Sequence, residues 1–381
     1  MSPSRLTHEQ REHIYERRIG PDVLAGAMAS RTPVAMLVAG QPGAGVQAAA
    51  AILHRDLAKT AGGVVQLSEA RLRAYHPHWR SEITQDVLRA HTIQPEITYW
   101  FDRIVQDAQR HRFHLMVEDE LLDPRAAHKL ALALRKDLYA VQAVFVSTQR
   151  DESTLSVMGQ FDRLRDRGLP ARFVSAQEHD IGFANVRVAM GLLEDRRSVD
   201  GIRLVDRNAS HFYENRLDEA GEWKKAPRAQ ASLDVLRDKA RPPKEQVKLA
   251  MRWETLTQRL VHDPELSREV ASQALVWRNE AAARCEAVPA TAQMLQWARE
   301  GAAFRVMDRF DFEKEFPHHG RAVAALGAAV IEAEKYDAKE SARFLASARE
   351  NIAQRIERGD MARIAAREKA MEQKSKEPPT R

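Results

Sequence analysis

The hydrophobic residues in the first half of the chain gather in short runs separated by helical segments. Four runs have the length and β-branched content of buried strands, at residues 33–39, 64–67, 113–117 and 140–147. Segments with helical spacing precede the last two runs, at residues 97–110 and 126–138. This alternation predicts an α/β fold, with a parallel sheet that carries helices on both faces.

The pattern changes after about residue 185. Residues 202–213 are apolar enough for a small hairpin or an extended arm, and Arg241-Pro242-Pro243 is the clearest linker signal. Beyond that linker, Ala, Glu and Arg recur with helical spacing, and the last helix is expected over residues 337–374. We therefore predict an α/β domain at residues 1–240, an α-helical C-terminal domain at 244–372 and a flexible tail at 373–381.

Composition excludes several classes of protein. The 381 residues are 44% hydrophobic, which supports a sizeable core and excludes global disorder. The net charge is only +5 with both signs mixed along the chain, so we predict no nucleic-acid partner. No apolar run approaches the roughly 20 residues that span a bilayer, so we expect no membrane contact. The lone Cys285 excludes a disulfide framework and fits a cytoplasmic location.

A glycine-rich segment follows the first predicted strand. It reads Gly40-Gln41-Pro42-Gly43-Ala44-Gly45-Val46-Gln47 and leads into a helical segment at 48–57. The glycine spacing is that of a phosphate-binding loop, in which backbone N–H groups and a helix N-terminus surround a phosphate. Val46 and Gln47 stand where such loops carry Lys and Ser or Thr, so the charge and the Mg²⁺ ligand are missing. The alternative is a strand-to-helix turn that binds nothing.

This loop and three further segments, in order, resemble the zeta-toxin family over about residues 15–190. Residues 67–79 (LSEARLRAYHPHW) resemble the family segment D-x-D-x-x-R-x-x-H-P-x-[YW], and residues 116–121 (MVEDEL) resemble its E-G-T-L strand end. Arg163 and Arg172, followed by Glu178-His179-Asp180, resemble its two arginines and its H-D element. The resemblance implies a P-loop kinase fold, ATP or GTP with Mg²⁺ as cofactors, UDP-N-acetylglucosamine as substrate and an antitoxin as partner.

Several positions that carry chemistry in the family are changed in this chain. The resemblance places the general-base Asp at Ala70, which accepts no proton, and the preceding Asp at Ser68. Glu69 is a possible substitute base, although side chains of adjacent strand-end residues point to opposite sides. The family Thr falls on Glu120, whose carboxylate would repel a diphosphate unless an Arg pairs with it.

Other positions carry the same residue type as the zeta-toxin motifs. By resemblance, Arg73 and Glu118 match substrate-side residues, and Glu96 is the candidate for a second such Glu. Arg163 and Arg172 match the catalytic arginines, although Leu164 stands where the family has an aromatic residue after the first. The nucleotide-binding candidates are the loop residues Gly40, Gly43, Gly45, Val46 and Gln47.

The leading hypothesis is a zeta-toxin-like pseudokinase whose phosphotransferase activity is lost or strongly reduced. In this hypothesis the chain keeps nucleotide or nucleotide-sugar binding, and an antitoxin-like or other protein is its partner. One alternative is an active kinase with rearranged catalytic residues, in which Glu69 is the base and Arg55 or Lys59 replaces the loop Lys. Another is an effector that acts through its C-terminal helices.

The histidines give no metal assignment. His76 and His78 flank Pro77 without a third ligand of matching spacing, and His318-His319 follow Pro317, where a loop is expected. His179-Asp180 is either a catalytic dyad or a structural pair at a helix start. The residues Trp253, Trp277 and Trp297 are expected in the core of the helical region.

Overall fold

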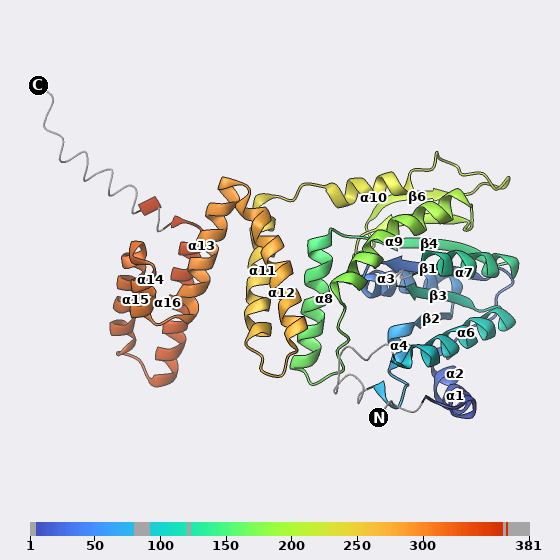
Figure 1. The fold of residues 1–381 in the computed structure, drawn as a ribbon, viewed down its shortest axis with the longest axis horizontal. Coiled ribbons are helices and arrows are strands. Elements are labelled where there is room, and N and C mark those ends of the chain that lie inside the picture. Colours follow the sequence, from blue (N-terminus) through green and yellow to red (C-terminus); the bar gives the residue numbers. More distant parts are fainter. Residues whose placement is uncertain (1–4, 80–91, 120–122, 361–362, 365–381) are drawn as a thin grey trace, which may run out of the picture. The chain divides into compact units, whose positions relative to one another are not determined.

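The computed structural model describes residues 5–79, 92–119, 123–360 and 363–364 (Figure 1). Two compact units make up the chain. The first comprises Met1–Ala240 with Glu265–Gln273, and the second comprises Arg241–Pro264 with Ala274–Arg381. The predicted tail at 373–381 lies outside the described residues.

A six-stranded sheet organises the first unit in the order β2-β3-β1-β4-β5-β6. The strands are β1 (Val34–Gly40), β2 (Val64–Ser68), β3 (His114–Asp119), β4 (Ala140–Val146), β5 (Gly201–Val205) and β6 (His211–Arg216). The first five strands are parallel, which confirms the predicted α/β sheet, and β6 pairs antiparallel with β5 at the edge. The segment expected as a hairpin or an arm is therefore a hairpin.

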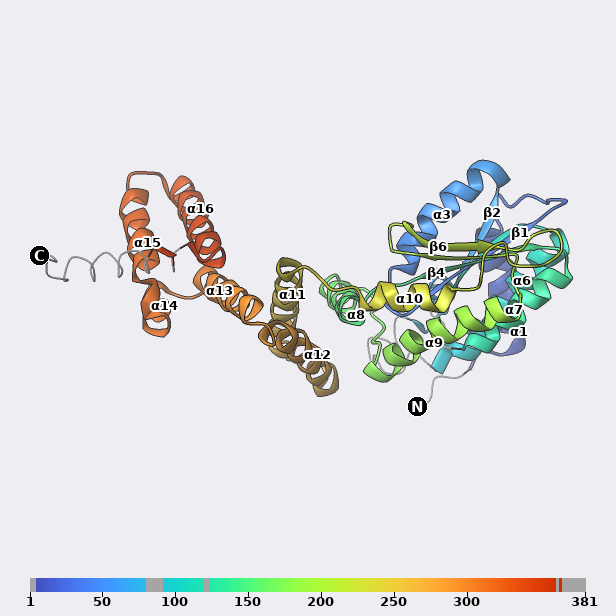
Figure 2. The ribbon, with the colours of Figure 1, turned by 90° about the horizontal axis from the view of Figure 1, so that it is seen from above.

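Helices cover both faces of the sheet (Figure 2). On β1, Leu37 packs toward α6, α7 and α9, whereas Val38 packs toward α3. This alternation is the pleat of a strand, whose successive side chains point to opposite faces. The helical elements of this unit are α1 (His8–Ile14), the π-helix η1 (Tyr15–Ile19), α2 (Gly20–Val23), α3 (Val46–Ala61), α4 (Glu69–Arg73), α6 (Gln94–His111), α7 (Pro124–Lys136), α8 (Arg150–Asp166), α9 (Ala176–Asp195) and α10 (Ala229–Asp238).

The position of β1 in the sheet marks where a ligand is expected. β1 lies between β3 and β4. The strands that follow β1 in the sequence, β2 and β3, lie on one side of it, and the next strand, β4, lies on its other side. Parallel α/β sheets bind ligands outside the carboxyl ends of the strands, at such a point of reversal. The glycine-rich loop follows β1 at this edge.

The second unit is helical, as the sequence predicts. Its elements are α11 (Pro243–Val261), α12 (Arg268–Glu286), which begins in the first unit, α13 (Pro289–Val306), α14 (Arg309–Glu315), the 3₁₀ helix η3 (Pro317–His319), α15 (Gly320–Ala333) and α16 (Ala338–Glu357). Trp253 and Trp277 are buried with ring centroids 5.8 Å apart, and Cys285 is a buried free thiol. In the part of the chain that the structure describes, no helix is long and apolar enough to cross a bilayer.

Two expectations for this unit are wrong. The helix expected over residues 337–374 is interrupted, because α16 ends at Glu357 and Gly359 adopts a φ of 70°. Glycine favours this left-handed conformation at helix ends, so the chain turns there. The pair His318-His319 lies in the helix η3 rather than in a loop, and His319 is buried.

Replacing Gly40 by Ala is expected to destabilise the first unit. A Cβ at Gly40 would lie 2.4 Å from the backbone oxygen of Val146, its register partner on β4, so the two central strands would have to move apart. We expect the free energy of unfolding to fall by about 1–3 kcal/mol, measured by denaturant titration. Gly320→Ala is the control, because its Cβ would meet no atom within 4 Å. Equal stability of Gly40→Ala and the wild type would contradict the tight approach of β1 and β4.

Candidate functional site

The backbone of the glycine-rich loop has the geometry of an anion-binding turn. Gly43 and Gly45 have φ values of 79° and 96°, which glycine adopts without strain. Gly45 gives α3 no side-chain cap, and the first turn of α3 carries no acidic residue. The N–H groups at this helix start and the positive end of the helix dipole therefore favour an anion.

The side chain at the lysine position of the loop adds no charge. Val46 packs with the buried residues between α3 and the sheet, and its Cγ2 lies 3.0 Å from where a Cβ of Gly40 would stand. Gln47 is exposed at the next position and is also uncharged. The loop consequently keeps its backbone donors but lacks a cationic side chain of its own.

A buried amide connects the loop to neighbouring segments. Gln41 is fully buried, and its Nε2 donates to the carbonyl oxygen of Thr148, 2.8 Å away. Arg237 from α10 donates to Gln41 Oε1 at 3.3 Å and to Ser147 Oγ at 3.2 Å. The Arg237 guanidinium lies 3.7 Å from the centroid of the Phe183 ring, and burial lowers its pKa to about 10. It therefore remains a cation at neutral pH.

Two segments approach the glycines of the loop closely. A Cβ at Gly43 would lie 2.1 Å from the backbone oxygen of Ser153 on α8, and one at Gly45 would lie 2.6 Å from Cβ of Arg207. Arg207 follows β5, and its guanidinium lies 3.6 Å from a carboxylate oxygen of Glu152. The loop therefore has a neighbouring arginine even though its own lysine position is apolar.

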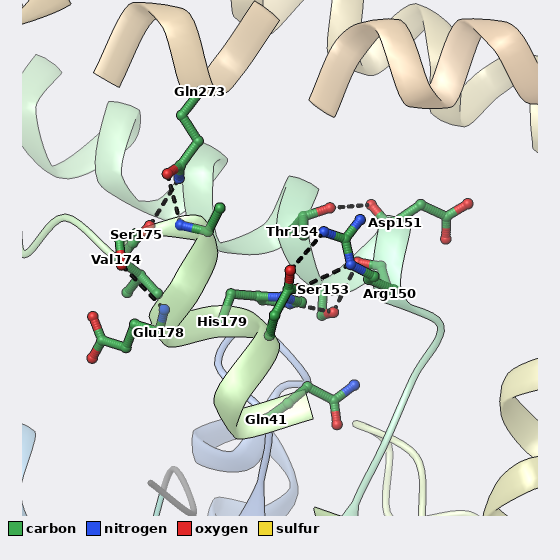
Figure 3. Close-up of polar contacts among 12 residues, drawn as sticks. Gln41, Arg150, Asp151, Ser153, Thr154, Val174, Ser175, Glu178, His179 and Gln273 are labelled. Atoms are coloured by element: carbon green, nitrogen blue, oxygen red, sulfur yellow. Dashed lines mark hydrogen bonds and ion pairs between the residues drawn. The ribbon is translucent and has the colours of Figure 1, made fainter. Parts of the chain in front are cut away.

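A chain of polar contacts joins α8 to α9 beside the loop (Figure 3). Ser153 Oγ lies 2.9 Å from Nε2 of His179, whose Nδ1 lies 3.1 Å from Asp180, and Arg150 binds both oxygens of Asp180 at 2.9 and 3.0 Å. Burial lowers the pKa of His179. Partial burial opposes ionisation of Asp180, but hydrogen bonds from Arg150 and His179 outweigh it and lower the pKa of Asp180.

The polar contacts of Ser153, His179 and Asp180 involve the residue types of a Ser-His-Asp triad, but their surroundings are those of a structural contact. Ser153 and His179 are both fully buried, and Ser153 Oγ also donates within its own helix. A nucleophile needs access to its substrate, which this burial denies. The arrangement agrees with the structural alternative for His179-Asp180, at the start of α9.

Arg172 and Arg163 have different surroundings. Arg172 forms an ion pair with Glu178 in the first turn of α9, and both side chains are largely buried. Ser175 caps this helix by accepting from the backbone of Glu178 at 3.1 Å (Figure 3). Arg163 is exposed on α8, ten residues beyond Ser153, which corresponds to about 15 Å along a helix. The structure therefore brings Arg172, but not Arg163, near the polar contacts between Ser153 and His179.

The substrate-side candidates include a compact network at the start of α4. The carboxylate of Glu69 accepts from Arg73 at 2.7 Å and from Gln94 at 2.8 Å. Ser68 is the N-cap of α4 and accepts from the backbone of Arg71. Ala70 is exposed in the first helical turn and offers no proton acceptor. The proposed substitute base, Glu69, is thus committed to Arg73 and Gln94.

Two further glutamates are buried to different degrees. Glu118 is the next-to-last residue of β3 and lies beside Ser68 of β2. It accepts from Gln66 at 2.7 Å, and burial raises its pKa. Glu96 in α6 is 3% exposed, and its Oε2 has no hydrogen-bond partner among the described residues. Glu120, the remaining candidate, lies outside the described residues.

The cations suggested as replacements for the loop lysine do not lie at the loop. Arg55 and Lys59 follow Val46 along α3 by 9 and 13 positions, which corresponds to about 14 and 20 Å of helix. Lys59 is exposed and pairs with Asp56 at 2.9 Å. Arg207 and Arg237 are instead the cations beside the loop. No local motif marks either residue, so sequence reasoning missed both.

The histidines around Pro77 form no complete metal site in the described chain. His76 is buried, its Nδ1 accepts from the backbone of His78 at 3.2 Å, and burial lowers its pKa to about 4. Among the described residues, the one group of three suitable ligands lies elsewhere, in the second unit.

The strand order, the glycine-rich loop and the helices on both faces define a kinase-like P-loop protein. The zeta toxin family model matches residues 22–218, more than half of the chain, and the chain belongs to that family.

Known relatives agree with this assignment. The toxin PezT of Streptococcus pneumoniae serotype 4 is 24% identical over 197 residues, which cover 50% of this chain and 75% of the relative. A solved structure from the PezAT chromosomal toxin-antitoxin system of Streptococcus pneumoniae has a TM-score of 0.55 at 20% identity. It covers 69% of this chain and 100% of its own. This likeness supports the fold.

Removing Arg237 is expected to loosen the loop. Arg237→Ala takes away the donors to Gln41 and Ser147, and a buried polar group that loses its partner costs about 1–3 kcal/mol. We expect a loss of that order in the free energy of unfolding. Arg187→Ala is the control, because Arg187 of α9 forms an exposed ion pair with Asp234 of α10, worth about 0–1 kcal/mol. Equal effects of the two substitutions would contradict the role assigned to Arg237.

Replacing Glu118 by Gln is expected to change stability in a pH-dependent way. Because the folded-state pKa of Glu118 is raised, the contribution of this group is favourable below its unfolded pKa and is lost as the pH rises through the folded pKa. Glu118→Gln should therefore raise the free energy of unfolding at pH 7.5 more than at pH 4. The exposed control Glu219→Gln should show no such difference. A stability gain that did not depend on pH would contradict this account.

Proposed function

We propose that this protein is a zeta-toxin-family P-loop protein whose phosphotransferase activity is lost or strongly reduced. The observation that carries the proposal is the placement of Val46. By resemblance this position belongs to the lysine that contacts the β- and γ-phosphates, and here its side chain packs into the apolar layer between α3 and the sheet. Positioning and charge supply almost all the catalysis of phosphoryl transfer, so this loss is a severe one.

The other changed positions support the same proposal. Gln47 replaces the hydroxyl that would hold Mg²⁺, and Ala70 replaces the general base. Glu69 is one residue from the base position, but its carboxylate is bound to Arg73 and Gln94. An attacking hydroxyl would therefore find no free carboxylate at either position.

Binding of a phosphate-bearing ligand is a separate part of the proposal. The backbone of the loop and the uncapped start of α3 retain the donors that surround a phosphate. Arg207 and Arg237 lie beside the loop and keep its surroundings positive. We infer that the chain binds a nucleotide or a nucleotide sugar without efficient turnover.

An active kinase with rearranged residues is the second candidate, and one observation favours it. Arg207 packs against Gly45, the residue before the lysine position of the loop, and so brings a cation next to that position. In this alternative Arg207 replaces the loop lysine. Removing Arg207 would then abolish efficient turnover, which the leading proposal does not expect of the wild type.

A protein partner is the last part of the proposal. The curated relative is named a toxin, and the solved structure comes from a toxin-antitoxin system. Membership of the same family supports an antitoxin-like partner for this chain. Co-purification with the product of a neighbouring reading frame is the corresponding test.

The activity is tested by restoring the changed positions. The wild type should show no turnover of ATP or GTP with UDP-N-acetylglucosamine and Mg²⁺ above the blank, while calorimetry detects nucleotide binding. The triple variant Val46→Lys, Gln47→Ser, Ala70→Asp should gain measurable turnover, because it returns the charge, the Mg²⁺ ligand and the base. The matched control Ala48→Lys places a lysine at an exposed position of the same helix and should gain none.

Turnover by the wild type that disappears in Arg207→Ala or Arg172→Ala would overturn the leading proposal in favour of the active kinase. Failure of every nucleotide and nucleotide sugar to raise the melting temperature would overturn the binding part, since a ligand of the folded state stabilises it by mass action.

A further inference from the structure

Three potential metal ligands converge in the second unit, whereas the glycine-rich loop belongs to the first. Glu300 comes from α13, whereas His318 and His319 come from the helix η3. Glu300 is 3% exposed and His319 is 2% exposed. One ligand atom from each of the three residues can be chosen so that all lie within 4.8 Å of one another.

The separations of the ligand atoms suit a small divalent ion. Nε2 of His319 lies 2.9 Å from Glu300 Oε2, and Nε2 of His318 lies 3.2 Å from Glu300 Oε1. Zinc bound at about 2.0–2.1 Å in a tetrahedral site holds its ligand atoms about 3.3 Å apart. Small rotations of these side chains would thus place them around one ion.

The buried carboxylate of Glu300 has no basic side chain other than histidine as a partner among the described residues. Within the described part of the chain, the ion pairs of Glu300 are with His318 and His319 alone, and no Lys or Arg pairs with it. The neighbouring Arg305 on α13 is bound to Glu350 and Glu357 instead. A buried carboxylate is costly unless it is compensated, and a divalent cation is one compensating group.

Surrounding contacts orient the ligands and leave one side open. Phe312 stacks on His319 with a centroid distance of 5.8 Å, and Gln296 donates to Glu300 Oε1 at 3.0 Å. Nδ1 of His319 is buried without a hydrogen-bond partner among the described residues, so its ring makes its polar contact through Nε2. The side chain of His318 is 54% exposed, which leaves room for water as a fourth ligand.

We propose that Glu300, His318 and His319 bind a divalent transition-metal ion, with Zn²⁺ the best match. Two imidazoles and one carboxylate are ligands that zinc accepts, and the fourth position is open to solvent. The site is formed by α13 and η3 alone, so it does not depend on the proposed function of the loop.

The test uses the purified full-length chain after removal of metal with a chelator and dialysis. Calorimetry with Zn²⁺ should show one ion bound per chain, and Co²⁺ should give the visible absorption bands of a four-coordinate site. His318→Ala should weaken Zn²⁺ binding by at least about tenfold, because losing a ligand costs more than losing an outer hydrogen-bond partner, which itself costs about 10–100-fold. Glu300→Gln should do the same.

The control is His262→Ala, which removes an exposed histidine from the same unit and should leave binding unchanged. Glu300 is buried, so its replacement can unfold the unit; His318 is exposed, and its variant decides the question if Glu300→Gln does not fold. Zn²⁺ binding by His318→Ala as tight as that of the wild type would overturn the proposal. So would the absence of stoichiometric binding by the wild type, which would leave the cluster a hydrogen-bonded Glu–His pair.

Discussion

The buried amide of Gln41 is the contact on which the geometry of the glycine-rich loop depends. It lies just after β1, donates to the backbone after β4 and accepts from Arg237 of α10. A fully buried amide needs partners for both of its ends, so these three segments must meet for the loop to take its shape. The side chain of Gln41 holds the loop against the sheet, while the backbone donors of the helix start remain for a ligand.

The charge around the loop follows from that arrangement. With Val46 packed into the core, positive charge comes from Arg207 and Arg237, which are supplied by segments after β5. Both are held by neighbours, and neither has the free reach of a lysine at the helix start. Positive charge near the loop stabilises a bound anion, whereas phosphoryl transfer also needs charges placed where negative charge develops on the phosphoryl group in the transition state. Binding and catalysis are therefore separable in this loop.

Local patterns predicted the parts of the fold whose causes are local. Buried parallel strands are short apolar runs, and the loop is marked by glycine spacing, so both were found from the sequence. Arg237 was missed because it lies 196 positions from Gln41, its partner, and no short motif encodes such a contact. The end of α16 was missed although its signal is local, because Gly359 stands inside an Ala-rich segment that otherwise continues the helical pattern.

The histidine pair in the second unit was also not recognised as a candidate metal site from the sequence. His318 and His319 follow Glu300 by 18 and 19 positions, a spacing that matches no common metal motif. Only the folding of the segment between α13 and η3, which contains α14, brings the carboxylate to the imidazoles. Metal binding couples to folding wherever the ligands meet only in the folded chain. An ion at Glu300 would therefore connect η3 to α13 and stabilise the helical unit. This stabilisation would be independent of the glycine-rich loop.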